Sequence, residues 1–301
     1  MTWFALALIA AFLFTLTYII DDNLVTHIYP GATFATIVSG LFNLLPIAAC
    51  ALYPVQLENL SPAYIALAIS AGIMTELAIW LYFRALAYDA PSVVAIVDII
   101  TPGFMLFLAY WIIGETLSYP QYAGFAIILI SSFCVTAPSL RRIGRSPALG
   151  FIMLSAALAA PGIMLQKLVY RQVDVWTGFV LFCVGILATS IGFMLFTQRG
   201  RAFCGEFRAR LHWRWIAAVL VSETFALTAF FVVHIAFSDG PVSLVTVIMG
   251  TTPIFVLLIS IMLFPFWPRL FRDQFGRHTF RKLGLMLIML GGIYLVRING
   301  G

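Results

Sequence analysis

Apolar runs close to 20 residues long recur along the whole chain, and they limit its fold more than any other feature. A helix of about 20 apolar residues crosses a hydrocarbon core of about 30 Å. Of the 301 residues, 62% are hydrophobic and 10% are charged, whereas a soluble domain carries roughly a quarter charged residues. We therefore predict an all-α integral membrane protein in the lipid bilayer.

Ten apolar segments can be drawn between short polar interruptions. The interruptions carry turn or charge signals, such as Asp21-Asp22-Asn23, Ser61-Pro62 and Ser238-Asp239-Gly240-Pro241. Because most of them are short, we expect a bundle of neighbouring helices. The predicted transmembrane helices lie at about 3–20, 32–53, 62–85, 92–113, 120–137, 148–170, 175–197, 214–237, 242–264 and 280–297.

An internal repeat divides the chain into two halves. The segment 90–105 (APSVVAIVDIITPGFM) aligns without a gap with 241–256 (PVSLVTVIMGTTPIFV), so the fourth predicted helix matches the ninth. A unit of five helices is odd in number, which places the two halves in opposite orientations, as in many secondary transporters. We predict a first repeat at 1–137, a basic linker loop at 138–147 and a second repeat at 148–301. Pro102 and Pro253 match in this alignment and are expected to loosen their helices.

The stretch GETLSYPQYAG (114–124) predicts a tight reversal between the fourth and fifth helices. Gly114 suits the turn, and Pro120 suits the first turn of the next helix. Glu115 is expected at the interface, either solvated or capping the N-terminus of the following helix.

This turn carries a resemblance to a known family. It is similar to the Gly-Glu-x-Leu-(Ser/Thr)-x-x-Gln-x-x-Gly turn of the EamA family, in the drug/metabolite transporter superfamily, and the segment 281–296 resembles the same element of the second repeat. One departure is that the second half has a basic loop at 265–279 where a matching Gly-Glu turn would lie. The resemblance implies a ten-span transporter of amino acids, amines or other metabolites, usually an exporter.

The basic residues predict an orientation. Of the 17 Lys and Arg, 13 lie in or beside three loops, at 138–147, 198–214 and 265–282. The positive-inside rule places these loops in the cytoplasm and both termini outside, whereas ten-span relatives are often drawn with both termini inside. We follow the charge count, and we expect a bacterial inner membrane. The net charge of +5 is explained by these loops, so we expect no nucleic-acid partner.

Glu76 is the strongest candidate for function, because a charge inside a bilayer is expensive and needs a reason. Trp80 and Phe83 follow it at helical spacing and share its face. A carboxylate beside aromatic rings suits an amine or quaternary ammonium through charge and cation–π attraction, and a buried carboxyl can also exchange a proton. The alternative is that Glu76 stays protonated and hydrogen-bonds a neighbouring helix.

Glu223 and Asp98 are the other acidic residues well inside predicted helices. Glu223, followed by Phe230 on the same face, lies in the repeat partner of the helix of Glu76, offset by roughly a turn. Asp98 lies four residues before Pro102 and is assigned either to proton or substrate contact or to an ion pair with Lys167 or Arg84.

Lys167 is expected to reach the interface or, alternatively, a substrate carboxylate. His234 lies near the end of its predicted helix, where a single histidine more often has a structural role.

The sequence lacks the motifs that mark other classes of protein, such as enzymes and nucleotide-driven transporters. The sequence contains no Walker A loop, no HExxH or GxSxG motif and no CxxC pair, so we expect no metal, no cofactor and no catalytic residues. The leading interpretation is a secondary active transporter of a small molecule that works by alternating access, with proton coupling as a hypothesis. The alternative is a membrane-embedded lipid-handling protein or enzyme. Two five-helix repeats in one chain are sufficient to form a transport pathway, so a monomer can function, and a dimer is the alternative oligomeric state.

Overall fold

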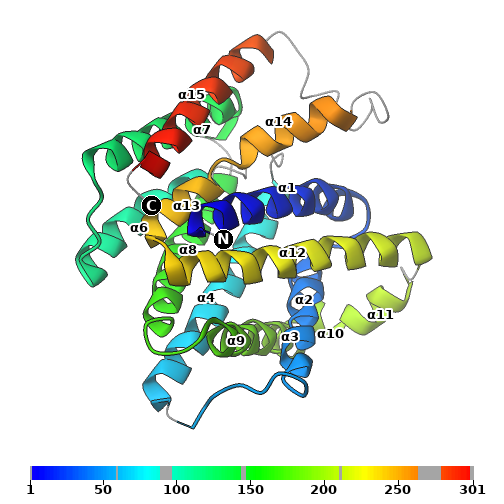
Figure 1. Ribbon diagram of the computed structural model, residues 1–301. Helices are drawn as coiled ribbons and strands as arrows, with labels where there is room; N and C mark the ends of the chain where they lie inside the picture. The colour runs from blue at the N-terminus through cyan, green and yellow to red at the C-terminus, as the bar shows by residue number, and fades with distance from the viewer. Residues whose placement is uncertain are drawn as a thin grey trace.

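The structure is a computed structural model that describes residues 2–58, 60–88, 97–143, 147–209, 212–263 and 279–298. The described residues form helices and no strand, as predicted (Figure 1). The helices are α1 (Trp3–His27), α2 (Ala32–Phe42), α3 (Leu44–Ala49), α4 (Pro62–Leu86), α6 (Val97–Ile113), α7 (Tyr119–Ile143), α8 (Ala148–Val169), α9 (Val175–Phe196), α10 (Gln198–Arg201), α11 (Phe203–Ala209), α12 (Trp213–Asp239), α13 (Val242–Met249), α14 (Thr252–Leu263) and α15 (Thr279–Ile298).

Helices occupy the ten apolar segments, but they differ in length. Seven candidate spans in the described residues are long and apolar enough to cross a membrane. Three further apolar helical stretches are shorter, at Ile99–Ile113, Tyr119–Val135 and Leu283–Arg297. The membrane class is thus confirmed, while the number of ten spans stays a prediction. α7 also continues to Ile143, into the segment expected to be a linker.

Local sequence explains where several helices begin. Ser61 caps α4, with its side chain accepting from the Ala63 N–H at 3.4 Å, and Pro62 occupies the first helical position, which tolerates a residue without an N–H. Asp174 caps α9 by accepting from the Thr177 N–H at 2.9 Å. Both are favoured N-cap residues.

The prediction of a turn at Asp21-Asp22-Asn23 is wrong, because α1 continues through these residues to His27. Asp21 is tolerated inside the helix because it has a partner on another helix. The Ser222 hydroxyl of α12 donates to Asp21 Oδ1 at 2.6 Å.

Two predicted helices are broken, at Asn43 and at Gly250–Thr251. At the second break, backbone carbonyls that lose their helical partners are satisfied by hydroxyl groups. Ser132 of α7 donates to the Gly250 carbonyl at 2.8 Å, and Thr251 donates to the Ile248 carbonyl at 2.6 Å. Irregular backbone at membrane depth is stable only with such substitutes.

Helices of the first half of the chain pack against helices of the second half. α1 packs along α12, α4 along α8, and α7 along α15, and α6 contacts α13; Figure 1 shows α7 and α15 together at one edge of the molecule. α4 and α9 approach closely, because a Cβ on Gly72 would lie 2.1 Å from the Phe182 carbonyl oxygen. Small residues allow such contact between membrane helices.

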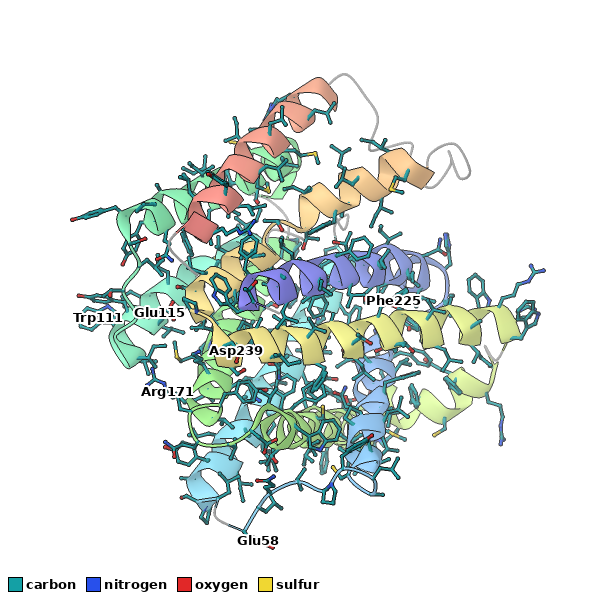
Figure 2. All side chains as sticks on the ribbon, in the orientation of Figure 1. Glu58, Trp111, Glu115, Arg171, Phe225 and Asp239 are labelled. Atoms are coloured by element: carbon teal, nitrogen blue, oxygen red, sulfur yellow. The ribbon has the colours of Figure 1, made fainter. Side chains whose placement is uncertain are left out.

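Large apolar side chains cover the outside, as a lipid-facing surface requires. Trp111 and Trp213 are each 69% exposed, and Figure 2 shows the labelled Trp111 at the periphery. Trp3, by contrast, is buried. Its ring packs against Gly240, where a Cβ would lie 2.6 Å from it.

A central cavity and its carboxyl groups

A cavity of about 220 Å³ lies between the two halves of the chain. α1, α2, α4 and α6 line it from the first half, and α8, α9, α12 and α13 line it from the second. Pockets for drug-sized ligands measure about 300–1,000 Å³, so this cavity suits a small metabolite. Because both halves form its walls, a movement of one half against the other would change its shape.

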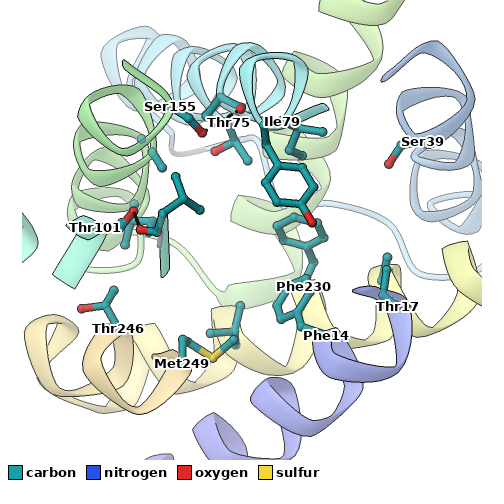
Figure 3. A pocket seen from close by; sticks show the side chains of 18 of the residues that line it. Phe14, Thr17, Ser39, Thr75, Ile79, Thr101, Ser155, Phe230, Thr246 and Met249 are labelled. Atoms are coloured by element: carbon teal, nitrogen blue, oxygen red, sulfur yellow. Dashed lines mark hydrogen bonds between the residues drawn. The ribbon is translucent and has the colours of Figure 1, made fainter. Parts of the chain in front are cut away.

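The walls combine aromatic rings with hydroxyl groups, as Figure 3 shows for Phe14 and Phe230 and for Thr75, Ser155 and Thr101. Phe14 and Phe230 meet edge to face, with their ring centroids 5.0 Å apart. Of the residues selected from the sequence, Phe83, Phe230 and Pro102 line the cavity.

Glu76 lies behind the cavity wall, fully buried between α4, α9 and α2. Ser190 of α9 donates to Glu76 Oε1 at 2.6 Å, and the same hydroxyl lies 3.3 Å from the Thr36 carbonyl. Glu76 Oε2 is buried without a hydrogen-bond partner. A Cβ on Gly40 would lie 2.7 Å from Glu76 Oε1, so glycine makes room for the carboxyl group.

Glu223 makes a similar pair on the other side. It is buried, and Ser39 of α2 donates to its Oε2 at 3.2 Å. Ser39 lines the cavity, so this carboxyl group is one hydroxyl away from the cavity. The two pairs use corresponding helices of the predicted repeat: Glu76 and Ser190 lie on α4 and α9, and Glu223 and Ser39 lie on α12 and α2.

Asp21 is the carboxyl group that lines the cavity itself, although the sequence predicted a turn at this residue. A usable signal was present. Phe14, Thr17, Tyr18 and Asp21 follow the i, i+3, i+4, i+7 spacing of one helix face, and all four line the cavity.

Tyr29 adds a neutral donor near these carboxyl groups. Its hydroxyl is buried without a hydrogen-bond partner. Burial raises the pKa of Tyr29, and Glu223 and Asp21 raise it further, so the hydroxyl keeps its proton.

Trp80 does not line the cavity. Its Nε1 donates to Thr33 Oγ1 at 3.3 Å, its ring stacks on Phe193, and the Arg84 guanidinium lies 4.9 Å from its ring centroid. The cation–π partner of Trp80 is therefore Arg84, one turn along the same helix.

The predicted partners of Asp98 are engaged elsewhere, and the side chains of Asp98 and Pro253 lie outside the described residues. Arg84 also lies 4.9 Å from the Phe151 ring centroid. Lys167 donates to the carbonyls of Phe237, Ser238 and Gly240 at 2.6 to 3.2 Å. Its ammonium group therefore caps the end of α12, and the alternative of a contact with a substrate carboxylate stays a prediction.

Glu115 caps a helix, but not the one that follows it. Its carboxylate accepts from the N–H groups of Val242 and Ser243 at 2.9 and 3.1 Å and from the Ser243 hydroxyl, so it caps α13 in the other half. Gly114 has φ of +67°, which favours glycine and turns the chain so that Glu115 reaches α13. Figure 2 shows the labelled Glu115 and Asp239 at the same end of the molecule.

Within the described part of the chain, no group of three or more His, Cys, Asp or Glu residues could hold a metal ion. The carboxyl groups instead sit among hydroxyl and aromatic groups. Such a site can bind an ammonium group or exchange protons.

The structure is that of a helical membrane protein with a cavity between its helices, and solved structures share this fold. A chain described as "Crystal structure of protein" superimposes with a TM-score of 0.68 at 17% identity, covering 98% of this chain and 97% of its own. No curated protein matches in sequence.

The family match is specific. Residues 1–137 match the model of the EamA-like transporter family, which confirms the resemblance seen in the sequence. Residues 1–137 are thus similar to the EamA-like transporter family, which lies within the drug/metabolite transporter superfamily.

Proposed function

We propose that the chain is a secondary active transporter that moves a small amine or amino acid through the central cavity, in the direction of export. The observation that carries the proposal is that corresponding helices of both halves line one cavity, with the Asp21 carboxyl group in its wall. Two inverted five-helix repeats that move against each other would open this cavity to one side of the membrane and then the other.

Asp21, Phe83 and Phe230 are proposed to contact the substrate. A carboxylate in an aromatic-lined cavity attracts a positively charged nitrogen by charge and by cation–π interaction. Trp80 packs against Phe193 and Arg84 outside the cavity lining, so it is not included among the substrate contacts. The role of Asp98 in substrate or proton contact stays a prediction.

Glu76 and Glu223 are proposed to carry protons that couple to substrate movement. Ser190 suits this role because it can serve Glu76 in both states. It donates to the carboxylate at 2.6 Å; when Glu76 is protonated, the hydroxyl can accept from Glu76 and donate to the Thr36 carbonyl, 3.3 Å away. A hydroxyl group has one donor and two acceptor sites, so neither state leaves Ser190 unpaired.

The test is a thermal-shift screen of the purified protein with choline, putrescine and the common amino acids. We expect a cationic compound to stabilise the wild type by several degrees through binding linkage. Asp21→Asn should lose this stabilisation, and Asp239→Asn, an exposed change outside the cavity, should retain it. Glu76→Gln should keep binding if it carries only protons. Stabilisation by no compound, or equal stabilisation of Asp21→Asn, would contradict the assignment of Asp21.

A further inference from the structure

A pair of polar residues lines the cavity at a distance from Asp21. Gln166 of α8 and His234 of α12 both line it. His234 lies 12 residues after Ser222, the partner of Asp21, on α12, which is about 18 Å along a helix. Counted from the first residue of its helix, Gln166 occupies the same position in α8 as Asp21 in α1. The two polar groups therefore mark two ends of the cavity.

Gln166 presents an acceptor without a protein partner. Its side chain is 1% exposed, and its Oε1 has no hydrogen-bond partner. The orientation of the amide is fixed by its other contact, because Nε2 lies 3.0 Å from the Gly178 carbonyl, which can only accept. Nε2 must donate there, so Oε1 is the atom left unpaired. A buried polar atom without a partner is costly, and a ligand donor would remove that cost.

His234 presents a donor, and a chain of hydrogen bonds fixes its tautomer. Gln166 Nε2 also donates to the Tyr170 hydroxyl at 2.7 Å. Among the described hydrogen bonds, His234 Nδ1, 2.6 Å away, is the acceptor that this hydroxyl reaches, so we infer that the Tyr170 proton is donated there. Nδ1 is an acceptor, so the neutral ring carries its proton on Nε2. Phe179 and Phe182 pack edge to face against the ring, with centroids 5.3 and 4.6 Å from it.

We propose that Gln166 and His234 form a recognition site for an uncharged group that has a hydrogen-bond donor beside an acceptor, such as a primary carboxamide. Gln166 Oε1 accepts from the ligand N–H, and His234 Nε2–H donates to the ligand carbonyl. The proposal rests on the transport function proposed above and adds the chemistry of the second end of its cavity. An aromatic amide suits the site because Phe182, Phe230 and Phe237 line the cavity near His234.

The test compares benzamide with N,N-dimethylbenzamide, which lacks the N–H donors, by equilibrium dialysis against the full-length protein in detergent. We expect wild type to prefer benzamide by about tenfold, the effect of one hydrogen bond to a buried acceptor. Gln166→Met removes the acceptor at similar volume and should reduce the preference to less than about twofold. Gln172→Met, an exposed change of the same kind, should leave it unchanged.

A spectroscopic measurement covers the case in which Gln166→Met does not fold. The ¹⁵N spectrum of His234 in wild type should show the proton on Nε2, and Tyr170→Phe should shift that equilibrium. Equal or no binding of the two benzamides to wild type, a preference that persists in Gln166→Met, or a proton on Nδ1 would each overturn the proposal. Because benzamide is uncharged, its binding does not depend on amine transport, so failure of the two proposals can be distinguished.

Discussion

The three described carboxyl groups in and behind the cavity wall are each paired with a serine on another helix. Ser190 serves Glu76, Ser39 serves Glu223 and Ser222 serves Asp21. A neutral hydroxyl stabilises a carboxyl group less than an arginine would, so it leaves both protonation states within reach. Hydroxyl partners therefore favour a role in proton exchange over a fixed ion pair.

Ser190→Ala should destabilise the protein, because it leaves Glu76 Oε1 without its partner in a fully buried site. We expect a loss of about 1–3 kcal/mol, measured as a lower melting temperature in detergent. Thr228→Ala is the matched control, since its hydroxyl is exposed and bonds within its own helix. An unchanged melting temperature for Ser190→Ala would show that water already solvates Glu76.

The sequence selected carboxyl and aromatic residues that lie in or near the cavity, but not their partners. The cost of a charge in the bilayer was enough to select Glu76 and Glu223, and helical spacing was enough to select Phe83 and Phe230. Their serine partners lie 114 and 184 positions away along the chain, so no local pattern could reveal them. Asp21 was missed because a pair of aspartates was interpreted as a turn.

At the level of helices, α4 and α9 depend on glycine for their close contact. A Cβ on Gly72 would lie 2.1 Å from the Phe182 carbonyl, and a Cβ on Gly185 would lie 2.1 Å from the Ile69 carbonyl. Gly72→Ala or Gly185→Ala should force the helices apart at a cost of about 1–3 kcal/mol or more, seen as a lower melting temperature. Gly192→Ala on the same α9 should have little effect, because nothing lies within 4 Å. Equal effects at Gly185 and Gly192 would argue against this helix contact.

The turn between α12 and α13 is held from both sides by distant residues. Lys167 binds the last carbonyls of α12, and Glu115 binds the first N–H groups of α13. Charges of these signs are stabilising at these helix ends.

Glu115→Ala should therefore destabilise the protein by about 1–2 kcal/mol, the usual effect of losing an N-cap. Thermal unfolding of this variant is compared with that of Glu58→Ala, an exposed change. If both variants melt like wild type, the cap contributes nothing measurable. The Gly-Glu turn was recognised from sequence, but its partner was assigned to the next helix because a local cap is the simplest expectation.

Helix positions were more predictable than helix breaks. Hydropathy located the apolar segments to within a few residues in most cases, because burial in lipid depends on composition. The break at Gly250–Thr251 lies just before Pro253, where a loosened helix was expected, but the Ser132 hydroxyl that satisfies the Gly250 carbonyl comes from another helix and could not be found from the local sequence.

For the whole molecule, the charge distribution predicts that the basic loops face the cytoplasm. Cys204 in α11 is exposed and lies within one of these loops, so it reports on orientation. In a variant that keeps only this cysteine, a membrane-impermeant maleimide should label inverted vesicles and leave intact cells unlabelled. A second variant with its only cysteine at position 58 (Glu58→Cys) should show the opposite pattern. Labelling of Cys204 in intact cells would show that the orientation is the opposite of the predicted one.

The predicted two-fold arrangement is the feature of the whole molecule on which the proposed transport depends. Helices that correspond in the predicted repeat line the cavity and carry the carboxyl–serine pairs. The family model matches residues 1–137, and the second half has a basic loop at 265–279 in place of a Gly-Glu turn.

The most direct test of proton-coupled transport through this cavity is flux in proteoliposomes. Vesicles are loaded with the radiolabelled amine that stabilises the protein best, and its efflux is measured with and without an inward proton gradient. We expect the gradient to accelerate efflux in wild type at least several-fold, and Asp21→Asn to abolish that efflux. Glu76→Gln should make efflux independent of the gradient. Efflux no faster than from empty liposomes, or an unchanged gradient dependence in Glu76→Gln, would contradict the account.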